Sequence, residues 1–322
     1  KSIANEAFTL SATEFTYNGS EQKPAVLAAE GRKMVEGTDY TVKYPDKSTD
    51  AGSYTVTVTG KGNYTDSVTC SYTIKKANGS GSVTMASYTF GETAPEPVAE
   101  SKTNGTANVT YSYTGTGREG TEYESQEPPT VVGKYTVTAV FAATKNAGKC
   151  SASAVFEVKA KGIVAGDFTM DKTEFSYDGN QQQPAVSPAV SSKLSAETDY
   201  TVSVPESKNA GDYEIKVEGK GNYTGTVTRS YKITPREAVI TVNNGTKTAG
   251  QNDPAFTGTV TGLIGENDLG VVSYVRTNNA EAVGTYTGVL TALYTENANY
   301  DVRVINGTFV ITAANNPNPN PP

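Results

Sequence analysis

The stretch Ala51-Gly52-Ser53-Tyr54-Thr55-Val56-Thr57-Val58-Thr59-Gly60-Lys61-Gly62-Asn63-Tyr64-Thr65 decides the fold class of this chain. Its apolar residues Tyr54, Val56 and Val58 alternate with threonines, which is the period-two pattern of a strand with one wet face. The segment 60–63 that follows is rich in Gly and Asn, which favour tight turns. The sequence therefore predicts a β-hairpin here, and not a phosphate loop, which would lead into a helix.

The same stretch occurs twice in the chain. Residues 60–65 return unchanged as residues 219–224, and the agreement extends from Phe8 and Phe168 to Ile74 and Ile233. The offset is 160 residues and drops to 159 in the loop after Pro45. A duplicated module of this kind is typical of proteins built for reach, spacing or multivalency.

Two landmarks divide the chain into four modules. Each module contains a Gly-x-Tyr that begins a Tyr/Val/Thr strand, followed by a terminal strand such as Tyr72-Thr73-Ile74. The Gly-x-Tyr landmarks begin at Gly52, Gly133, Gly211 and Gly284. We expect modules at residues 1–76, 77–160, 161–235 and 236–314, with a Pro/Asn-rich linker at 315–322. The connections between modules are very short, which predicts an elongated array.

The composition favours an all-β chain. Of 322 residues, 36% are hydrophobic, and there are 20 Tyr and 9 Phe but no Trp. Turn signals separate short alternating strands at Asn18-Gly19, Asn104-Gly105, Asp178-Gly179, Asn244-Gly245 and Asn306-Gly307. Because no stretch of ten or more residues has a helical period, we expect β-sandwich modules.

Several motifs resemble known families. The segment 50–54 resembles the entry to strand F of immunoglobulin-like domains, where a tyrosine hydroxyl bonds back to the upstream backbone. Val56 stands where antibody domains have a cysteine. The first and third modules resemble bacterial Ig-like repeats of Gram-positive surface proteins, on Thr-Asp-Tyr-Thr-Val, Ala-Gly-x-Tyr and Gly-Lys-Gly-Asn-Tyr. The second module is similar to a companion repeat, on residues 88–92 and 128–135.

The fourth module resembles the MBG-type repeat of bacterial surface proteins. The residues that carry this likeness are 253–256, 261–263, 283–286 and Asn299-Tyr300. The resemblances together imply four tandem immunoglobulin-like β-sandwich modules in an exported protein that is extracellular, at the cell surface or attached to the cell wall.

Charge and hydropathy bear on the partners. The net charge is −7 and Lys and Arg are spread along the chain, so we expect no nucleic-acid partner. No apolar run approaches the roughly 18–20 residues that span a bilayer. Thr and Lys interleaved on edge strands discourage association, so we expect a monomer. Lys1 is not a natural start, so we expect a mature or trimmed fragment.

Catalytic and metal chemistry find little support. The chain has no His, which removes His-based acid–base catalysis and imidazole metal ligands. Paired carboxylates could hydrolyse a glycoside, but the candidates lie in polar loops and we expect them to be solvated: Glu119, Glu122, Glu124, Glu266 and Asp268. We expect no enzyme, no catalytic residue, no metal and no cofactor. Calcium at a module junction and a Lys–Asn isopeptide bond stay open as alternatives.

The two cysteines lie in different modules. Cys70 and Cys150 each lack a partner in their own module. We expect two thiols on final strands. A single Cys70–Cys150 disulfide is the alternative, which modules placed end to end would disfavour.

Most tyrosines recur at matched positions, which indicates core packing. We expect packing for Tyr40, Tyr54, Tyr72, Tyr200, Tyr213 and Tyr231. Four tyrosines lack a repeated counterpart, could therefore be exposed, and are our candidate ligand-binding residues: Tyr111, Tyr113, Tyr123 and Tyr294.

These observations predict a non-catalytic stalk or spacer that presents a functional domain or contributes to adhesion. The alternative is a carbohydrate- or host-matrix-binding module, either an adhesin or an accessory region of a secreted glycoside hydrolase. Its partner would be a polysaccharide, a host glycan or a matrix protein.

Overall fold

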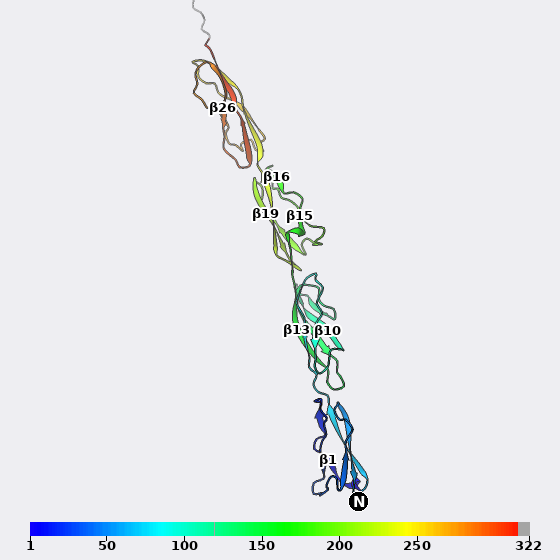
Figure 1. Ribbon diagram of the computed structural model, residues 1–322. Helices are drawn as coiled ribbons and strands as arrows, with labels where there is room; N and C mark the ends of the chain where they lie inside the picture. Colours follow the sequence, from blue (N-terminus) through cyan, green and yellow to red (C-terminus); the bar gives the residue numbers. More distant parts are fainter. Residues whose placement is uncertain (119, 315–322) are drawn as a thin grey trace, which may run out of the picture. The chain divides into compact units, whose positions relative to one another are not determined.

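The computed structural model describes residues 1–118 and 120–314 of the chain, so Glu119 and the expected linker 315–322 lie outside the described residues. The fold is all-β, as expected, and its only helices among the described residues are two short 3-10 turns (Figure 1). Two compact units divide the chain, unit 1 at Lys1–Lys161 and unit 2 at Gly162–Pro322. Each unit is described below as a first and a second half: residues 1–76 and 77–161 in unit 1, and 162–235 and 236–314 in unit 2.

The first half of unit 1 is a sandwich of two sheets. After the turn η1 (Ile3–Asn5), a two-stranded sheet pairs β1 (Phe8–Leu10) with β3 (Val26–Ala28). The opposing sheet has the order β2 (Glu14–Thr16), β6 (Ser67–Lys75), β5 (Gly52–Gly60) and β4 (Tyr40–Lys43). Leu10 and Val26 of one sheet pack against buried Val56, Tyr72 and Ile74 of the other.

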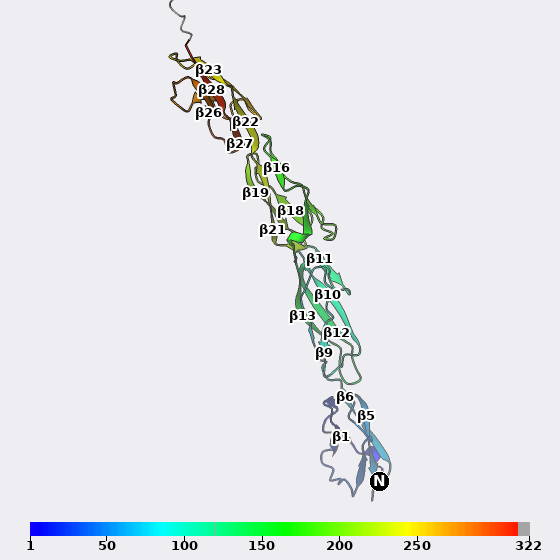
Figure 2. The ribbon, with the colours of Figure 1, turned by 45° about the horizontal axis from the view of Figure 1, so that its top comes forward.

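The second half of unit 1 repeats this two-layer plan. A small sheet pairs β7 (Ser82–Thr84) with β9 (Val98–Glu100). The larger sheet has the order β11 (Glu122–Ser125), β10 (Val109–Gly117), β12 (Gly133–Phe141), β13 (Cys150–Lys159) and β8 (Tyr88–Thr89) (Figure 2).

Unit 2 begins with the repeated module. The strand β14 (Lys161–Gly162) lies at the division between the units, and η2 (Ala165–Asp167) follows. One sheet pairs β15 (Phe168–Met170) with β17 (Val186–Pro188), and β20 (Tyr223–Thr224) lies nearer the end of this half. The other sheet has the order β16 (Glu174–Ser176), β21 (Thr226–Thr234), β19 (Gly211–Gly219) and β18 (Tyr200–Ser203).

The second half of unit 2 has two sheets of more equal size. The first has the order β24 (Gly258–Thr261), β22 (Arg236–Val242) and β27 (Tyr300–Ile305). The second has the order β23 (Gly245–Thr248), β28 (Gly307–Thr312), β26 (Gly284–Leu293) and β25 (Ser273–Arg276).

An early strand pairs in parallel with a late strand in every half. The parallel pairs are β2 with β6, β8 with β13, β16 with β21, and both β22 with β27 and β23 with β28. Most of the other strand pairs are antiparallel, such as β5 with β6. At the start of each second half, a parallel pairing of Ala77 with Ala147 and of Arg236 with Tyr300 places the loop after the long strand beside the connection between the halves.

The period-two prediction for residues 52–60 is confirmed. Val56 and Val58 are fully buried on β5, while the threonines between them lie on the more exposed face. The hairpin to β6 is also present, with Val58 opposite Val68. Three of the predicted packing tyrosines are buried within the hydrophobic clusters: Tyr40, Tyr72 and Tyr231. Tyr54 and Tyr213 are partly buried and pack against these clusters. Tyr200 belongs to a separate cluster with Phe168 and Val217.

A tyrosine corner occurs in every half. The hydroxyl of Tyr54 donates to the carbonyl of Asp50 at 2.7 Å, as the resemblance to immunoglobulin-like domains implied. The same bond to the carbonyl four residues upstream is made by Tyr135, Tyr213 and Tyr286, at 2.8 Å each. The corner fixes the loop that precedes the long strand of each half.

The Gly residues of the predicted turns serve two different purposes. Gly19, Gly105 and Gly179 have φ between +69° and +83°, the left-handed region that glycine tolerates. Gly245 and Gly307 instead begin strands β23 and β28. A Cβ on Gly307 would lie 2.6 Å from the Asn243 carbonyl oxygen, so close backbone approach requires glycine there.

Candidate functional site

A single asparagine joins the two halves of unit 1. Asn146 lies in the loop between β12 and β13, and its side-chain oxygen accepts a hydrogen bond from the Ala51 backbone N–H at 2.8 Å. Its amide nitrogen donates to the Asp50 carboxylate at 2.9 Å. Its own carbonyl accepts from the Ala77 N–H at 2.9 Å. We call this three-point arrangement the asparagine clasp of unit 1.

Charge reinforces this clasp. The Lys145 ammonium lies 2.6 Å from the Asp50 carboxylate. The hydrogen bond from Lys145, and then that from Asn146, lowers the pKa of Asp50 below its ordinary value, while Asp50 raises the pKa of Lys145. Lys76 also crosses the junction and donates to the Thr144 carbonyl at 2.7 Å. The tyrosine corner of Tyr54 holds Asp50 in place, so the fold of the first half positions the acceptor for the second.

Unit 2 contains the same clasp. Asn299 accepts from the Ala210 N–H at 2.7 Å, donates to the Asn209 side-chain oxygen at 3.2 Å, and accepts from the Arg236 N–H at 2.9 Å through its carbonyl. Asn209 and Ala210 are the repeat counterparts of Asp50 and Ala51. The two units therefore use one solution for joining their halves, with an uncharged Asn209 in place of the Asp50 carboxylate.

An aromatic contact seals the junction of unit 2. Tyr177, the repeat counterpart of Tyr17, packs edge-on against Tyr300 with ring centroids 5.5 Å apart. Tyr177 is 9% exposed and Tyr300 6%, and both belong to one hydrophobic cluster that runs from Ile215 in the first half to Phe309 in the second. The Tyr300 hydroxyl donates to Asp268 and accepts from the Ile264 N–H, so hydrogen bonds fix the hydroxyl end of the ring.

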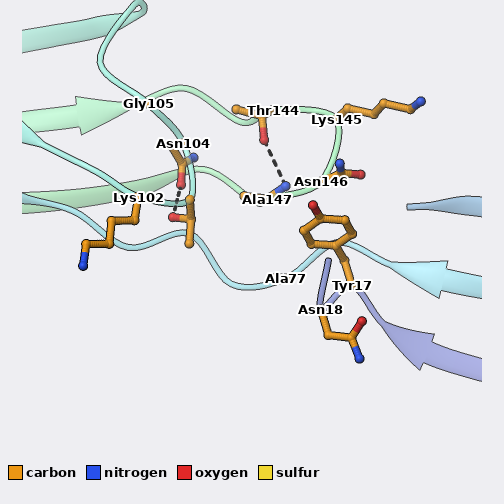
Figure 3. A pocket seen from close by; sticks show the side chains of 11 residues that line it. Tyr17, Asn18, Ala77, Lys102, Asn104, Gly105, Thr144, Lys145, Asn146 and Ala147 are labelled. Carbon is orange, nitrogen blue, oxygen red and sulfur yellow. Dashed lines mark hydrogen bonds between the residues drawn. The ribbon is translucent and has the colours of Figure 1, made fainter. Parts of the chain in front are cut away.

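The same place in unit 1 is hollow. Ala147 follows Asn146 where Tyr300 follows Asn299, and a methyl group cannot fill the space of a phenol ring. A cavity of about 520 Å³ remains, bordered by Tyr17, Ala77, the loop that contains Lys102 and Asn104, and the loop that ends at Ala147. Figure 3 shows the Tyr17 ring directed toward the Asn146–Ala147 segment. The hydrophobic clusters of the two halves stay separate in unit 1.

Two of the walls of this hollow are rigid. The Asn104 amide donates to the carbonyls of Ala142 and Gly148 at 2.8 and 3.0 Å. The Thr144 hydroxyl accepts from the Ala147 N–H at 3.0 Å. By contrast, the Tyr17 hydroxyl makes no hydrogen bond to the described part of the chain, and the Asn18 and Lys102 side chains at the rim are exposed.

The four candidate tyrosines are packed to different degrees. The exposure that we considered for Tyr113 is not observed, because this residue is 4% exposed and packs edge-on against Phe156 at 6.1 Å. Tyr111 and Tyr123 are partly buried against the same cluster, and the Tyr123 hydroxyl donates to the Glu127 carbonyl at 2.7 Å. Tyr294 is partly buried and borders a separate hollow of about 460 Å³ with Glu296 and Asn297. Ligand binding by these four residues stays a prediction.

The carboxylates considered for hydrolysis are dispersed. Glu122 and Glu124 are exposed on β11, and Glu266 is exposed in the loop before β25. The expectation that Asp268 is solvated is wrong. This residue is partly buried and accepts hydrogen bonds from Tyr300 and from the Gly265 N–H. The hydrogen bond from the Tyr300 hydroxyl lowers the pKa of Asp268. Through this bond the carboxylate supports the Tyr300 ring of the aromatic seal. Among the described residues no group of three His, Cys, Asp or Glu could hold a metal ion.

The second half of unit 2 contains a cluster of four charged side chains. Lys247 is 7% exposed and lies 2.8 Å from Asp253 and 2.5 Å from Glu281. Arg276 pairs with the same two carboxylates at 2.8 and 2.7 Å and lies over the Phe309 ring at 4.9 Å. Asp253, and then Glu281, raises the pKa of Lys247, while Lys247, and then Arg276, lowers the pKa of Glu281. Since an isopeptide bond needs an uncharged amine, these shifts favour an ion pair at Lys247.

Sequence reasoning missed the clasp, although a signal for it exists. An asparagine recurs in the loop that follows the long Gly-x-Tyr strand of each module, at Asn63, Asn146, Asn222 and Asn299. The residue after it is tyrosine in every case except Ala147. We had interpreted the first of these segments only as a turn, because the partners of Asn146 and Asn299 lie about 90 residues away.

The fold and the junctions define an all-β protein of joined immunoglobulin-like halves. Residues 238–310 match the MBG domain (YGX type), so the second half of unit 2 is similar to this module of bacterial surface proteins. The matched stretch contains the Lys247 cluster and the clasp residue Asn299. No curated protein matches the chain. No helix in the described residues is both long and apolar enough to cross a membrane.

Proposed function

We propose that this chain is a non-catalytic spacer of an exported bacterial cell-surface protein, which presents a functional domain or contributes to adhesion. It consists of four modules at 1–76, 77–160, 161–235 and 236–314, and acts as a monomer. The match of residues 238–310 to a surface-protein module supports the cellular location. The hydrogen bonds of the partly buried Asp268 and the ion pairs of the Lys247 cluster support a structural role for these charged groups and the absence of catalysis.

The pair of asparagine clasps is the observation that carries this proposal. A spacer must resist bending at its joints, and short linkers alone leave domain motions as the default. Each clasp adds two side-chain hydrogen bonds across a joint, and a net contribution of roughly 0.5–1.5 kcal/mol for each bond restricts that motion. An enzyme or a simple binding domain would have no need for the same clasp in both units.

Pulsed electron–electron double resonance on the full chain tests the stiffness of the junction that this function requires. Nitroxide labels at Lys43→Cys and Val155→Cys place one probe on an exposed position in each half of unit 1, with Cys70 and Cys150 replaced by Ser. We expect a narrow distance distribution that broadens in the Asn146→Ala variant. A distribution that is already broad with Asn146 present would contradict the spacer proposal.

Protease shaving of intact cells that produce the protein tests the location. Tryptic peptides of this chain should be released while the cells stay intact, and a cytosolic marker should stay inside. Light scattering of the purified chain tests the monomer, for which the expected mass is 33.8 kDa.

Carbohydrate or host-matrix binding is the second candidate function. The observation that favours carbohydrate over matrix protein is the hollow beside Tyr17. Tyr294 is the alternative site for a sugar, since it borders a hollow of its own.

A further inference from the structure

We propose that the hollow beside Tyr17 in unit 1 is a binding site for one neutral pyranose ring of a polysaccharide. The site lies at the junction of residues 1–76 and 77–161, beside the asparagine clasp, and its test is separate from that of the spacer function. A spacer with this site would hold a glycan strand at a fixed distance from the domain that it presents.

The internal repeat supplies the size of the ligand. Three elements border the hollow in unit 1: Tyr17, the loop after β9 and the loop after β12. The corresponding elements of unit 2 are Tyr177, the loop after β24 and the loop after β26, and between them lies the Tyr300 ring. A space that a six-membered ring fills in one unit is therefore open in the other because of Ala147. Its volume of about 520 Å³ falls within the roughly 300–1,000 Å³ of ligand pockets.

A second difference widens the opening in unit 1. In unit 2 the turn at Gly179 approaches the loop after β24, so that a Cβ on this glycine would lie 3.1 Å from Ile264. The repeat counterpart Gly19 has no atom within 4 Å of the same position. The turn in unit 1 consequently leaves the hollow open to solvent on the side of Asn18.

The chemistry of the lining favours a pyranose over an aromatic side chain. The Tyr17 ring offers an aromatic surface, while its hydroxyl has no hydrogen-bond partner in the described residues. The exposed Asn18 amide nitrogen and Lys102 ammonium add donors at the rim, while the Asn18 side-chain oxygen accepts from the Ser20 N–H. A sugar ring combines C–H groups for the aromatic surface with several hydroxyls for the Tyr17 hydroxyl and these donors, and an aromatic side chain offers fewer such groups. The nearby Lys145 is already paired with Asp50, and Lys102 lies at the exposed rim where solvent and salt screen its charge, so a neutral sugar is favoured over an acidic one.

The walls are preorganised for such a ligand. Asn104, Thr144 and Asn146 hold the two loops through hydrogen bonds within the protein. Little conformational entropy is then lost on binding, which matters for a site that gains contacts with only one ring.

Saturation-transfer NMR with the full chain tests the proposal. The probes are the methyl pyranosides of glucose, galactose, mannose and xylose, and N-acetylglucosamine, each with its short oligomers. We expect transfer to the ring protons of at least one series. Ala147→Tyr should reduce the affinity at least tenfold by filling the hollow as Tyr300 does in unit 2, and it should raise the thermal midpoint of unit 1. Tyr17→Leu should weaken binding by a similar factor.

Tyr294→Leu is the matched control, because Tyr294 borders a different hollow in unit 2. Binding should be unchanged in this variant. No transfer to any probe, or transfer that survives Ala147→Tyr, would overturn the proposal, and loss of binding in Tyr294→Leu alone would move the site to unit 2. If Ala147→Tyr fails to fold, the Tyr17 ring signals of the unsubstituted chain decide, since they must shift on titration with the bound sugar.

If the NMR experiment shows no transfer to any sugar but the spin-label distance distribution is narrow, the sugar site is ruled out and the spacer function stays in place.

Discussion

Truncation of Tyr177 should uncouple the halves of unit 2, whereas truncation of its counterpart Tyr17 should leave the second half of unit 1 unaffected. Tyr177→Ala removes a ring that is 91% covered and that packs against Tyr300 at 5.5 Å. Replacing a buried large aromatic residue by Ala costs roughly 3–5 kcal/mol. The Tyr177–Tyr300 ring pair contributes about 0.5–1.5 kcal/mol of this, and it is the share that reaches the second half.

Tyr17→Ala provides the comparison within the same chain. Tyr17 is only partly buried, in the cluster of its own half, and faces a hollow across the junction. We expect its truncation to cost roughly half as much, near 2 kcal/mol. The strands of the other half should change by no more than about 0.3–0.5 kcal/mol, the scatter seen for independent sites.

Hydrogen exchange measured by mass spectrometry on the full chain resolves these local effects. Peptides from β22 and β27 should lose about 0.5–1.5 kcal/mol of protection in Tyr177→Ala. Peptides from β12 and β13 should keep theirs in Tyr17→Ala. The claim is that the aromatic seal couples the two halves only in unit 2. It would be refuted if β12 and β13 lost as much protection in Tyr17→Ala as β22 and β27 lose in Tyr177→Ala, or if β22 and β27 kept their protection in Tyr177→Ala.

The remaining predictions concern the clasp, the charged cluster and the thiols. Asn299→Ala removes two side-chain hydrogen bonds and should lower the stability of the unit 2 junction by roughly 1–3 kcal/mol, measured by calorimetry against a surface Asn→Ala control. The pKa of Glu281 is lowered in the folded state, so its contribution to stability is present above the unfolded pKa and is lost as the pH falls through the folded pKa. The Glu281→Gln variant should therefore lose less thermal stability than the parent between about pH 5 and pH 3, and an identical acid profile would contradict this. Lys247 should stay an ion pair, so the intact mass should equal that of the sequence, without the loss of one ammonia that a Lys–Asn isopeptide bond would cause. Cys70 and Cys150 are free, so a thiol reagent should label both in the denatured chain without reductant.

Local patterns were sufficient for the strands. The alternation of Tyr54, Val56 and Val58 predicted both the β5–β6 hairpin and its buried face, because side chains on a strand alternate with a period of two. The Gly-x-Tyr landmark likewise led to the tyrosine corners, whose hydroxyl bonds span only four residues. Interactions of this kind are encoded within a short stretch and survive any tertiary arrangement.

Chain contacts across long separations were not accessible in the same way. Tyr113 has no repeated counterpart, so the sequence allowed it to be exposed. The pairing of β10 with β12 instead places it against Phe156 in the core. Asp268 looked like loop charge until the fold placed Tyr300 beside it. In both cases the burial depends on a strand pairing or a loop approach that no local period specifies.

The sequence by itself determined the fold class, the duplication and the positions of the strands and corners, because those follow from side-chain period and turn chemistry. Only the tertiary structure decided what the junctions do. Asn146 and Asn299 are ordinary loop residues until the fold brings them to Ala51 and Ala210, about 90 residues away. The exchange of Ala147 for the tyrosine found at Tyr300 gains its meaning there too, because a missing ring makes a hollow only when three separate elements enclose the space.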